Sequence, residues 1–576
     1  MKKQGFLKGS AILLISTVIT KALGLVYRIP LTRLLGGTGM GYFAAAFSVF
    51  TPILAVFAAG IPSTLARAAA ENYALERFGN LRRIKRVAVT MFCGVSLAAS
   101  VLVAIAAVPL SKALSGSAGP GVTVMCIAPS LFFCTVISVY RGYYEGLHNM
   151  YPTAVSEIIE TVFRLVLGLG FAYAVHSYCM TSFAKTGRCF GVVCENAAQA
   201  HQTSLVYVAA AAILGTSLSS GIACVYMLIR SRLRGDGITP QMLGKDSVAE
   251  PSGRIAKHLL ASCMPIAFTA LITTFSGMID MLAVAPCVSA AMKSCPQAFE
   301  KYLGGSVSAE MLPNFVYGSF EGLAAAVAGL VPTLTAMLGK STLPSAAESF
   351  AKGDVAAVGS SVNKMLTLSA FIAFPSGIGV SVFSEDILHL LFGGRTQEIA
   401  VAAPCLRVLG AAVVLMSLSL PCFTLLQALG RSRTAVTVML LGGAVKLCAD
   451  LVFITAPATS VIGAALADAL SEGFICVCAV CATCRLAKTH IDWKNVLFKP
   501  AYCGAMSIGT AFLLRSFLLS QQLFAAAGRA VTAICIVFSV IMYLIMTLVL
   551  CEMPKNVVMS LFCKKNRKKD LKFSEK

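Results

Sequence analysis

The feature that most constrains this chain is a series of apolar stretches, repeated along its whole length. A helix of about 20 apolar residues crosses the ~30 Å hydrocarbon core of a bilayer. Leu, Ala, Val and Ile run through these stretches without the polar/apolar alternation of membrane-spanning strands. Charged residues make up only 12% of the 576 residues, against about a quarter in a typical soluble domain. The sequence therefore predicts an all-α polytopic membrane protein.

We expect about fourteen transmembrane helices, since the chain contains that many apolar stretches of sufficient length. The predicted helices lie near residues 6–29, 40–66, 87–110, 121–141, 152–176, 204–229, 257–287, 311–338, 362–384, 400–428, 433–456, 459–483, 498–519 and 524–551. This pattern predicts an N-terminal six-helix lobe, a cytoplasmic loop between lobes, a second six-helix lobe, two additional helices and a basic cytoplasmic tail. Their ranges are 1–229, 230–256, 257–484, 485–551 and 552–576.

A short repeat supports the two lobes. Thr153-Ala-Val and Thr434-Ala-Val each follow a Gly-containing turn, and each precedes a cation about three helical turns further on, Arg164 and Lys446. Transporters built from two lobes of the same topology commonly bind their substrate between the repeats.

The net charge of +22 is confined mainly to alternate loops and the two ends of the chain. Cytoplasmic loops of membrane proteins carry such an excess of Lys and Arg. Both termini are therefore predicted to be cytoplasmic, which requires an even number of crossings. This distribution argues against nucleic-acid binding. The tail Lys564–Lys569 is expected to bind anionic lipid head groups, with a protein partner as the alternative.

Among the 21 cysteines, those on the predicted outer side of the membrane allow one disulfide, whose pairing cannot be deduced from the sequence. Cys179, Cys189, Cys194 and Cys295 fall in predicted outer loops, where oxidising conditions allow pairing. A second group, at positions 476–484, has four cysteines in an apolar helix. We interpret these as small buried hydrophobic residues rather than metal ligands.

Charged residues within the first predicted helix indicate a binding site for an anion. Lys21, Gly24 and Arg28 are spaced to share one helical face, and Arg33 follows near the outer end. A cationic stripe on an otherwise apolar helix suits an anionic substrate such as a phosphate group. The alternative is that these side chains extend to the membrane interface.

Other ionisable residues at membrane depth fall on later helices, where each is costly unless it faces a partner or a cavity. Glu160 and Arg164, four residues apart, can pair on the fifth helix. Asp280 and Glu321 have no cation close by in the sequence, whereas Asp450 follows Lys446 by one turn. We predict that Asp280, Glu321 and Asp450 couple transport to Na⁺ or H⁺, with cavity-facing polar residues as the alternative.

Motifs for chemical catalysis are not found in the sequence. Gly36-Gly37-Thr38-Gly39 lacks the Lys-Ser/Thr ending of a phosphate-binding loop and is interpreted as a turn between helices. No nucleotide-binding motif or hydrolase-like constellation appears in the chain, and its six histidines are scattered. We therefore expect a non-enzyme without a bound cofactor.

Two longer motifs carry a resemblance to a known family. The first runs from Lys3 to Ser10 and resumes at Thr20-Lys-Ala-Leu-Gly-Leu-Val-Tyr-Arg-Ile-Pro-Leu-Thr-Arg-Leu-Leu-Gly36. The second is Gly142-Tyr-Tyr-Glu-Gly-Leu-His-Asn-Met-Tyr-Pro-Thr-Ala-Val-Ser-Glu-Ile-Ile-Glu-Thr-Val-Phe-Arg164. They resemble stage V sporulation protein B and related polysaccharide-biosynthesis flippases, which belong to the multidrug/oligosaccharidyl-lipid/polysaccharide superfamily.

The resemblance implies a MATE-like fold in the bacterial cytoplasmic membrane. It also implies a flippase that moves an undecaprenyl-diphosphate-linked oligosaccharide, such as the peptidoglycan precursor lipid II, by alternating access. We predict that Lys21 and Arg28 contact the diphosphate with Arg164 in support. The predicted substrate-binding set also includes Arg33 and Glu160. Cell-wall synthesis proteins are candidate partners.

The chain departs from characterised lipid II flippases at several positions. A basic residue stands at Lys21 as in that family, but the next cavity arginine falls on Tyr27, and Arg28 comes one place later. The second-helix arginine has no counterpart in Ile53–Gly60, and Glu321 occupies the region of the eighth-helix arginine. These departures concern the choice of substrate more than the class of protein.

Two other functions are compatible with this fold. A cation-coupled exporter of small molecules, such as drugs, is the first, but such exporters often carry a carboxylate on the first helix, where this chain has Lys21. A non-transporting scaffold of a cell-wall or sporulation complex is the second, and the basic tail would suit it.

Overall fold

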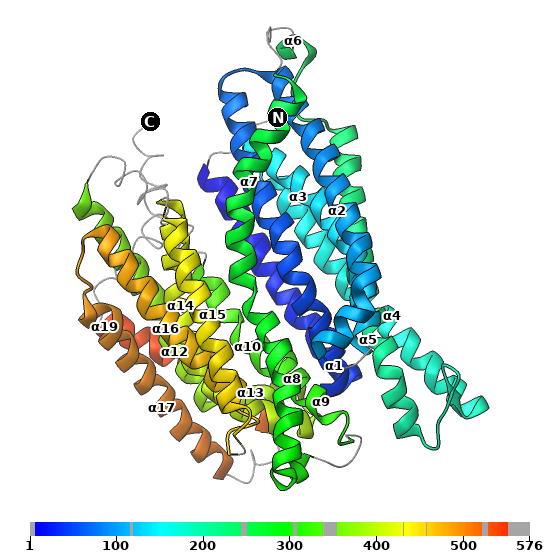
Figure 1. Cartoon of the computed structure of the whole chain (residues 1–576). Helices are drawn as coiled ribbons and strands as arrows, with labels where there is room; N and C mark the ends of the chain where they lie inside the picture. The colour runs from blue at the N-terminus through cyan, green and yellow to red at the C-terminus, as the bar shows by residue number, and fades with distance from the viewer. Residues whose placement is uncertain are drawn as a thin grey trace, which may run out of the picture. The chain divides into compact units, whose positions relative to one another are not determined.

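The computed structural model of the chain describes residues 6–115, 119–243, 250–302, 308–336, 338, 354–429, 431–456, 458–520 and 528–550. Almost all of these residues are helical, and the prediction of an all-α polytopic membrane protein is confirmed (Figure 1). The predicted basic tail lies outside the described residues.

The first helix, α1 (Phe6–Ala74), contains the first two predicted membrane spans. Its 69 residues are far more than the ~20 that cross a bilayer once. Gly36 divides it into two arms, because its backbone leaves the helical region with φ 61° and ψ −170°. Glycine adopts a positive φ without the steric cost that a side chain would add. The predicted turn at Gly36–Gly39 is therefore a one-residue break.

The remaining helices follow the predicted apolar stretches to within several residues at most ends. Up to residue 319 they are α2 (Phe78–Ser115), α3 (Gly119–Gly146), α4 (Tyr151–Thr186), α5 (Ala197–Leu233), α6 (Pro240–Leu243), α7 (Ser252–Thr274), α8 (Ser276–Ser294), the 3-10 helix η1 (Pro296–Tyr302) and α9 (Leu312–Ser319). Beyond it they are the π-helix η2 (Phe320–Ala325), α10 (Ala326–Ala328), α12 (Val355–Val382), α13 (Ser384–Phe392), α14 (Thr396–Ala428), α15 (Ser432–Phe453), α16 (Gly463–Ala487), the π-helix η3 (Lys494–Phe498), α17 (Lys499–Ser520) and α19 (Gly528–Leu550).

Twelve helices among the described residues are long and apolar enough to cross a membrane, or thirteen with the bent pair Leu312–Ala328 and Leu330–Ala336. In this total α1 counts as one helix, and α7 with α8 forms one broken span. Counting the two arms of α1 separately raises thirteen to fourteen, the number predicted from the sequence.

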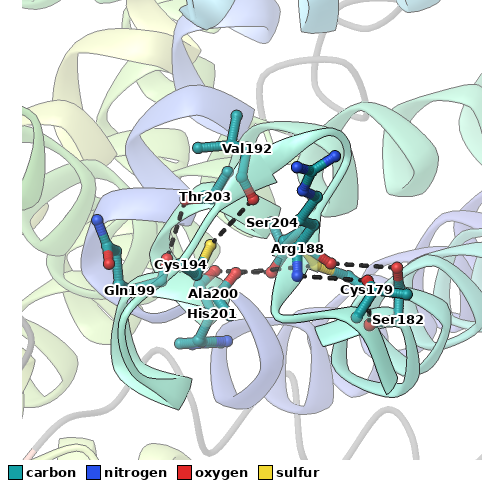
Figure 2. The surroundings of a disulfide bond; sticks show 12 residues. Cys179, Ser182, Arg188, Val192, Cys194, Gln199, Ala200, His201, Thr203 and Ser204 are labelled. Carbon is teal, nitrogen blue, oxygen red and sulfur yellow. Dashed lines mark hydrogen bonds between the residues drawn. A yellow bond between two sulfur atoms is a disulfide. The ribbon is translucent and has the colours of Figure 1, made fainter. Parts of the chain in front are cut away.

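Helices α4 and α5 extend past their apolar stretches, so most of the polar segment predicted as a loop is helical. Figure 1 shows the two helices running side by side and projecting beyond α1–α3. A two-stranded hairpin, β1 (Arg188–Cys189) and β2 (Val192–Val193), connects them. The disulfide Cys179–Cys189 joins α4 to β1, so the disulfide that the sequence allowed in this region is present. Buried Cys194 lies beside it (Figure 2).

Contacts divide the chain into two units. Unit 1 comprises residues 1–323, 394–401 and 439–467, and unit 2 comprises 324–393, 402–438 and 468–576. The core of unit 1 lies between α2, α3, α5, α7 and the second arm of α1. A core cluster of unit 2 contains Phe383, Ile508 and Ala511. The lobe boundaries predicted from the sequence stay a prediction.

Glycines allow α1 and α9 to approach closely within unit 1. A methyl group added at Gly318 would collide with the backbone of Gly37 and Gly41. One added at Gly41 would lie 2.5 Å from the carbonyl oxygen of Asn314. Membrane helices that pack at this distance commonly use small residues. This approach brings the charged face of α1 next to α9 and η2.

Candidate functional site

The predicted cations of the first helix lie on the first arm of α1 and differ in their surroundings. Lys21 and Arg33 are exposed, and Arg28 is half-buried. Lys21 lies close enough to Arg164 of α4 for the two positive charges to interact. The two helices are also joined by Ser16, whose hydroxyl donates to the Glu157 carboxylate over 2.8 Å. The structure thus brings Lys21 and Arg164, 143 residues apart in sequence, into one group.

Glu160 of α4 lies between two arginines. Arg164 donates to its carboxylate over 3.0 Å, as its position one turn away predicted, and Arg141 of α3 donates over 3.2 Å. The hydroxyl of Ser220 on α5 donates to the same carboxylate over 3.1 Å. The Glu160 side chain is only 14% exposed. One buried carboxylate therefore holds two guanidinium groups, and with Lys21 the cluster carries two positive charges more than this carboxylate balances.

Arg28 contacts the segment that contains Glu321. Its Nη2 donates to the Glu321 carbonyl oxygen over 2.9 Å, and the charges of the two side chains interact. Glu321 lies in η2, and the wider turn of a π-helix leaves backbone groups out of the regular α-helical pattern. Such π segments occur frequently at functional sites. Glu321 had no cation nearby in the sequence, and the structure supplies one from a helix almost 300 residues away.

Asp280 likewise has a cation that sequence spacing did not reveal. Lys446 of α15 donates to its carboxylate over 2.7 Å, and the two residues are 2% and 3% exposed. Asp450, one turn beyond Lys446 on the same helix, is fully buried. The hydroxyl of Tyr317 on α9 lies 3.0 Å from Ser48 of α1, and its electrostatic neighbours include Asp280, Lys446 and Glu321.

Arg33 belongs to different surroundings from the other predicted cations. Its carbonyl oxygen accepts a hydrogen bond from Arg395, and the N–H of Gly37 donates to Glu398 over 3.2 Å. These contacts border a polar cavity of about 220 Å³ at the break in α1. His201 and Gln397 also line it. Arg33 is thus placed by the break in α1, whereas Lys21 is placed by α4 and Arg28 by η2.

A second charged group lies in the connections between the predicted membrane spans, outside the spans themselves. Asp236, in the connection after α5, accepts hydrogen bonds from the Tyr143 hydroxyl over 3.0 Å, from the Ile238 N–H over 3.2 Å and from Arg82 over 3.4 Å. Burial favours a higher pKa for the Asp236 carboxyl, but these hydrogen bonds and the charge of Arg82 outweigh burial and lower the pKa. The group ties the start of α2 to α3 and to the α5–α6 connection.

Unit 2 contains a large apolar cavity of about 570 Å³ between α12, α17 and α19. Phe371, Ile508 and Val540 are among the residues that line it, together with the hydroxyl-bearing Tyr543. Tyr543 donates its hydroxyl to the Phe371 carbonyl oxygen over 2.8 Å. This cavity could not be predicted from the sequence, because runs of Leu, Ile and Val look alike whether they face lipid, protein or an open space.

Metal binding finds no support among the described residues, where no group of three His, Cys, Asp or Glu side chains could hold an ion. The cysteines at positions 476–484 lie on α16 and range from buried Cys476 to exposed Cys481, without bonding to one another. Arg141 is the principal site residue that the sequence did not reveal. It immediately precedes the second family motif, and its position on α3 opposite Glu160 depends on how α3 packs near α4.

Comparison with known proteins gives two family-level matches. Residues 6–188 match the family described as "Polysaccharide biosynthesis protein", and residues 331–550 match "Lipid II flippase MurJ". Stage V sporulation protein B of Bacillus subtilis (strain 168) is 22% identical over 473 residues, which cover 81% of each chain. Lipid II flippase MurJ of the same organism is 21% identical over 451 residues, covering 77% of this chain and 76% of its own.

Solved structures share the fold. A lipid II flippase MurJ in an inward closed conformation has a TM-score of 0.62 at 12% identity, covering 94% of this chain and 99% of that one. An inward-facing MATE family multidrug resistance transporter has a TM-score of 0.59 at 14% identity, covering 81% and 96%. The chain is therefore a polytopic membrane protein with the fold of transporters of the MOP superfamily.

Within this class the chain is related to the polysaccharide biosynthesis proteins, to stage V sporulation protein B and to the lipid II flippases. The family resemblance inferred from the first-helix motif and the Gly142–Arg164 motif is confirmed. The names of these relatives describe flippases, transporters and a sporulation protein rather than enzymes, which fits the expectation of a non-enzyme.

Proposed function

We propose that the chain is a flippase that moves an undecaprenyl-diphosphate-linked oligosaccharide, a lipid II-like cell-wall precursor, across the bacterial cytoplasmic membrane by alternating access. The observation that carries this proposal is the cluster of Lys21, Arg141, Glu160 and Arg164 in unit 1. Arg141 and Arg164 hold one carboxylate, and the exposed Lys21 lies within electrostatic reach of Arg164. An anionic head group would supply the charge that this cluster lacks.

A diphosphate fits the chemistry of this cluster. It carries negative charge on several oxygens, and guanidinium groups form charge-assisted hydrogen bonds with phosphate oxygens in a fixed, forked geometry. Arg164 is 32% exposed, so part of its guanidinium can reach a ligand while Glu160 holds the rest. We assign diphosphate contact to Lys21 and Arg164 with Arg28 in support, and we place Arg33 outside this cluster, at the break in α1.

Unit 2, taken by itself, contains an apolar cavity that suits a lipid chain. Its lining is almost entirely aliphatic and aromatic, and its volume of about 570 Å³ accommodates part of an isoprenoid chain. A lipid chain that passes from the bilayer core into this cavity stays in apolar surroundings, so the transfer exposes none of its surface to water. A polar solute would gain nothing from the same lining. This cavity therefore supports a lipid-linked substrate over a water-soluble sugar.

Multidrug export is the principal alternative, because a solved structure with this fold is a multidrug transporter. A cationic drug would meet Lys21 and Arg164, which repel it. Carboxylates are present on α4, but Glu160 is held by two arginines. A scaffold role in a cell-wall or sporulation complex would not require a cationic group at membrane depth. We also propose that both termini are cytoplasmic.

The test is flipping of fluorescent lipid II by the purified protein in liposomes. Wild type is compared with the double variant Lys21→Ala/Arg28→Ala and with Arg67→Ala, a control in which an 82%-exposed arginine of the same helix is removed. We expect flipping by wild type and by the control, and its loss in the double variant. Equal flipping by all three proteins would contradict the role of the cations, and no flipping by wild type would contradict lipid II as the substrate.

A further inference from the structure

The buried group formed by Asp280, Lys446 and Asp450 takes no part in the proposed substrate contacts. Lys446 lies 2.7 Å from Asp280 across two helices, and Asp450 follows it by one turn on its own helix. All three residues are at most 3% exposed. Ionisable residues at membrane depth are expensive to bury and usually mark an ion pathway or a coupling site.

We propose that Lys446 is a tethered cation that occupies the place a sodium ion would need between Asp280 and Asp450, so that the transport cycle exchanges a proton at these carboxylates. A second cation beside the Lys446 ammonium would be repelled by it, and the repulsion is strong where water is excluded. A proton avoids this repulsion, because it converts a carboxylate into a neutral carboxylic acid. The inference rests on the proposed transport function and names its coupling ion.

The charged and titratable groups around the site come from five elements of the fold. Asp280 and Cys287 lie on α8, Lys446 and Asp450 on α15, Tyr317 and Glu321 on α9 and η2, and Arg28 on α1. The charges of Asp280, Lys446 and Glu321 all reach Tyr317.

These neighbours connect the proton site to a predicted substrate contact. Asp280, Lys446 and Glu321 are all within electrostatic reach of Tyr317, and Arg28 hydrogen-bonds the Glu321 carbonyl oxygen. A change of charge at Asp280 therefore alters the electrostatic field at Glu321. It thereby alters the strength of the interaction between Glu321 and Arg28. Conversely, an anion bound at Arg28 changes the field at the buried carboxylates. Linkage requires that each binding event affects the other equally.

The proton step changes only one O–H bond. A proton enters from the outer side, adds to a carboxylate oxygen of the Asp280/Asp450 pair and leaves from that oxygen toward the inner side after the transporter has reoriented. While the carboxylate is protonated, the Lys446 ammonium pairs with the other one. Nothing is oxidised or reduced, and the Lys446 charge stays in the protein throughout the cycle.

The first experiment needs no transport. Melting of the purified protein in detergent is measured in NaCl, KCl and choline chloride at equal ionic strength, for wild type, Lys446→Gln and Lys446→Arg. Wild type and Lys446→Arg are expected to melt at the same temperature in all three salts. In Lys446→Gln the two carboxylates lack their ammonium and should bind sodium, which raises the melting temperature by roughly 2–4 °C over choline.

A melting temperature of wild type that rises specifically in sodium would overturn the proposal. So would a folded Lys446→Gln whose melting temperature is the same in all three salts. If Lys446→Gln does not fold, the proposal is tested instead with Asp450→Asn, by measuring flipping of lipid II in liposomes. Wild type should flip lipid II faster with an acid-outside pH gradient and should not respond to a sodium gradient, while Asp450→Asn should lose the response to pH. Flipping that follows only the sodium gradient would refute the inference.

The two arms separate the failure of the inference from the failure of the proposed function. No flipping of lipid II under any gradient contradicts the proposed substrate, whereas the melting experiment reports on the Lys446 site alone. A sodium response that appears only when Lys446 is removed would support the tethered cation even then.

Discussion

Neutralising Glu160 should destabilise the protein far more than neutralising an equivalent glutamate at the surface. In Glu160→Gln, the Arg141 and Arg164 guanidinium groups lose the carboxylate that lies 3.2 and 3.0 Å away. Removing one partner of a fully buried ion pair costs about 3–5 kcal/mol. Here Arg141 and Arg164 are 19% and 32% exposed, so water screens part of the loss, and we expect about 2–3 kcal/mol.

The matched control is Glu71→Gln on α1. Glu71 pairs with Arg67 at the same four-residue spacing and a similar distance of 2.9 Å, but the two side chains are 52% and 82% exposed. Exposed pairs of this kind contribute about 0.3–0.5 kcal/mol. The two variants therefore differ in burial and in the number of arginines that one carboxylate serves.

The assay is reversible unfolding of the detergent-purified protein, with the free energy of unfolding compared among wild type, Glu160→Gln and Glu71→Gln. Adding Arg141→Gln to Glu160→Gln removes one of the two stranded cations and should recover part of the lost stability. Equal effects of Glu160→Gln and Glu71→Gln would refute the reasoning, as would a second substitution that adds its full cost to the first.

Three further predictions concern other parts of unit 1. The pKa of Asp236 is lower in the folded protein than its unfolded value of about 3.9. Its contribution to stability is therefore present above a pH of about 3.9 and is lost as the pH falls through the folded pKa. In Asp236→Asn, the melting temperature should lack the part of its fall at acid pH that comes from this carboxyl. Replacing Cys189 by Ser should make the α4–β1 connection sensitive to trypsin at Arg188 while the melting temperature of the membrane part changes little, and a global loss of folding would contradict this. Gly318→Ala should cost about 1–3 kcal/mol in unfolding free energy because its methyl group meets the α1 backbone, whereas the control Gly170→Ala, with open space around it, should not destabilise.

The membrane helices could be predicted from the sequence because a span requires only a local property, about 20 apolar residues in a row. The pair Glu160–Arg164 was predictable for a similar reason, since residues four apart on a helix are neighbours. The extension of α4 and α5 was not, because polar residues in a helix and in a loop have similar compositions. Helix α4 continues to Thr186 and α5 begins at Ala197, on either side of the disulfide-bonded hairpin.

Contacts between distant helices account for what the sequence could not show at the candidate site. Lys446 is 166 residues from Asp280, and its spacing from Asp450 suggested a partner on its own helix rather than on α8. Arg141 is 19 residues from Glu160, a separation that becomes a contact only when α3 and α4 turn back on one another. An isolated charge in an apolar helix predicts that a partner exists, but packing decides which one.

The close packing of α1 against α9 gives the proposed proton site a mechanical connection to the proposed substrate site. Gly37 and Gly41 let α9 approach α1 closely just after the break, and Arg28, on the arm before the break, reaches the backbone of η2. A π-helical turn departs from the α-helical hydrogen-bond pattern and occurs frequently at functional sites, so we propose that η2 is the segment whose register shifts. Such a shift would move the Glu321 carbonyl away from Arg28 and change the environment of Tyr317 in the same step. The charge state of the Asp280–Lys446 pair and the hydrogen bond between Arg28 and Glu321 would then change together in one local rearrangement.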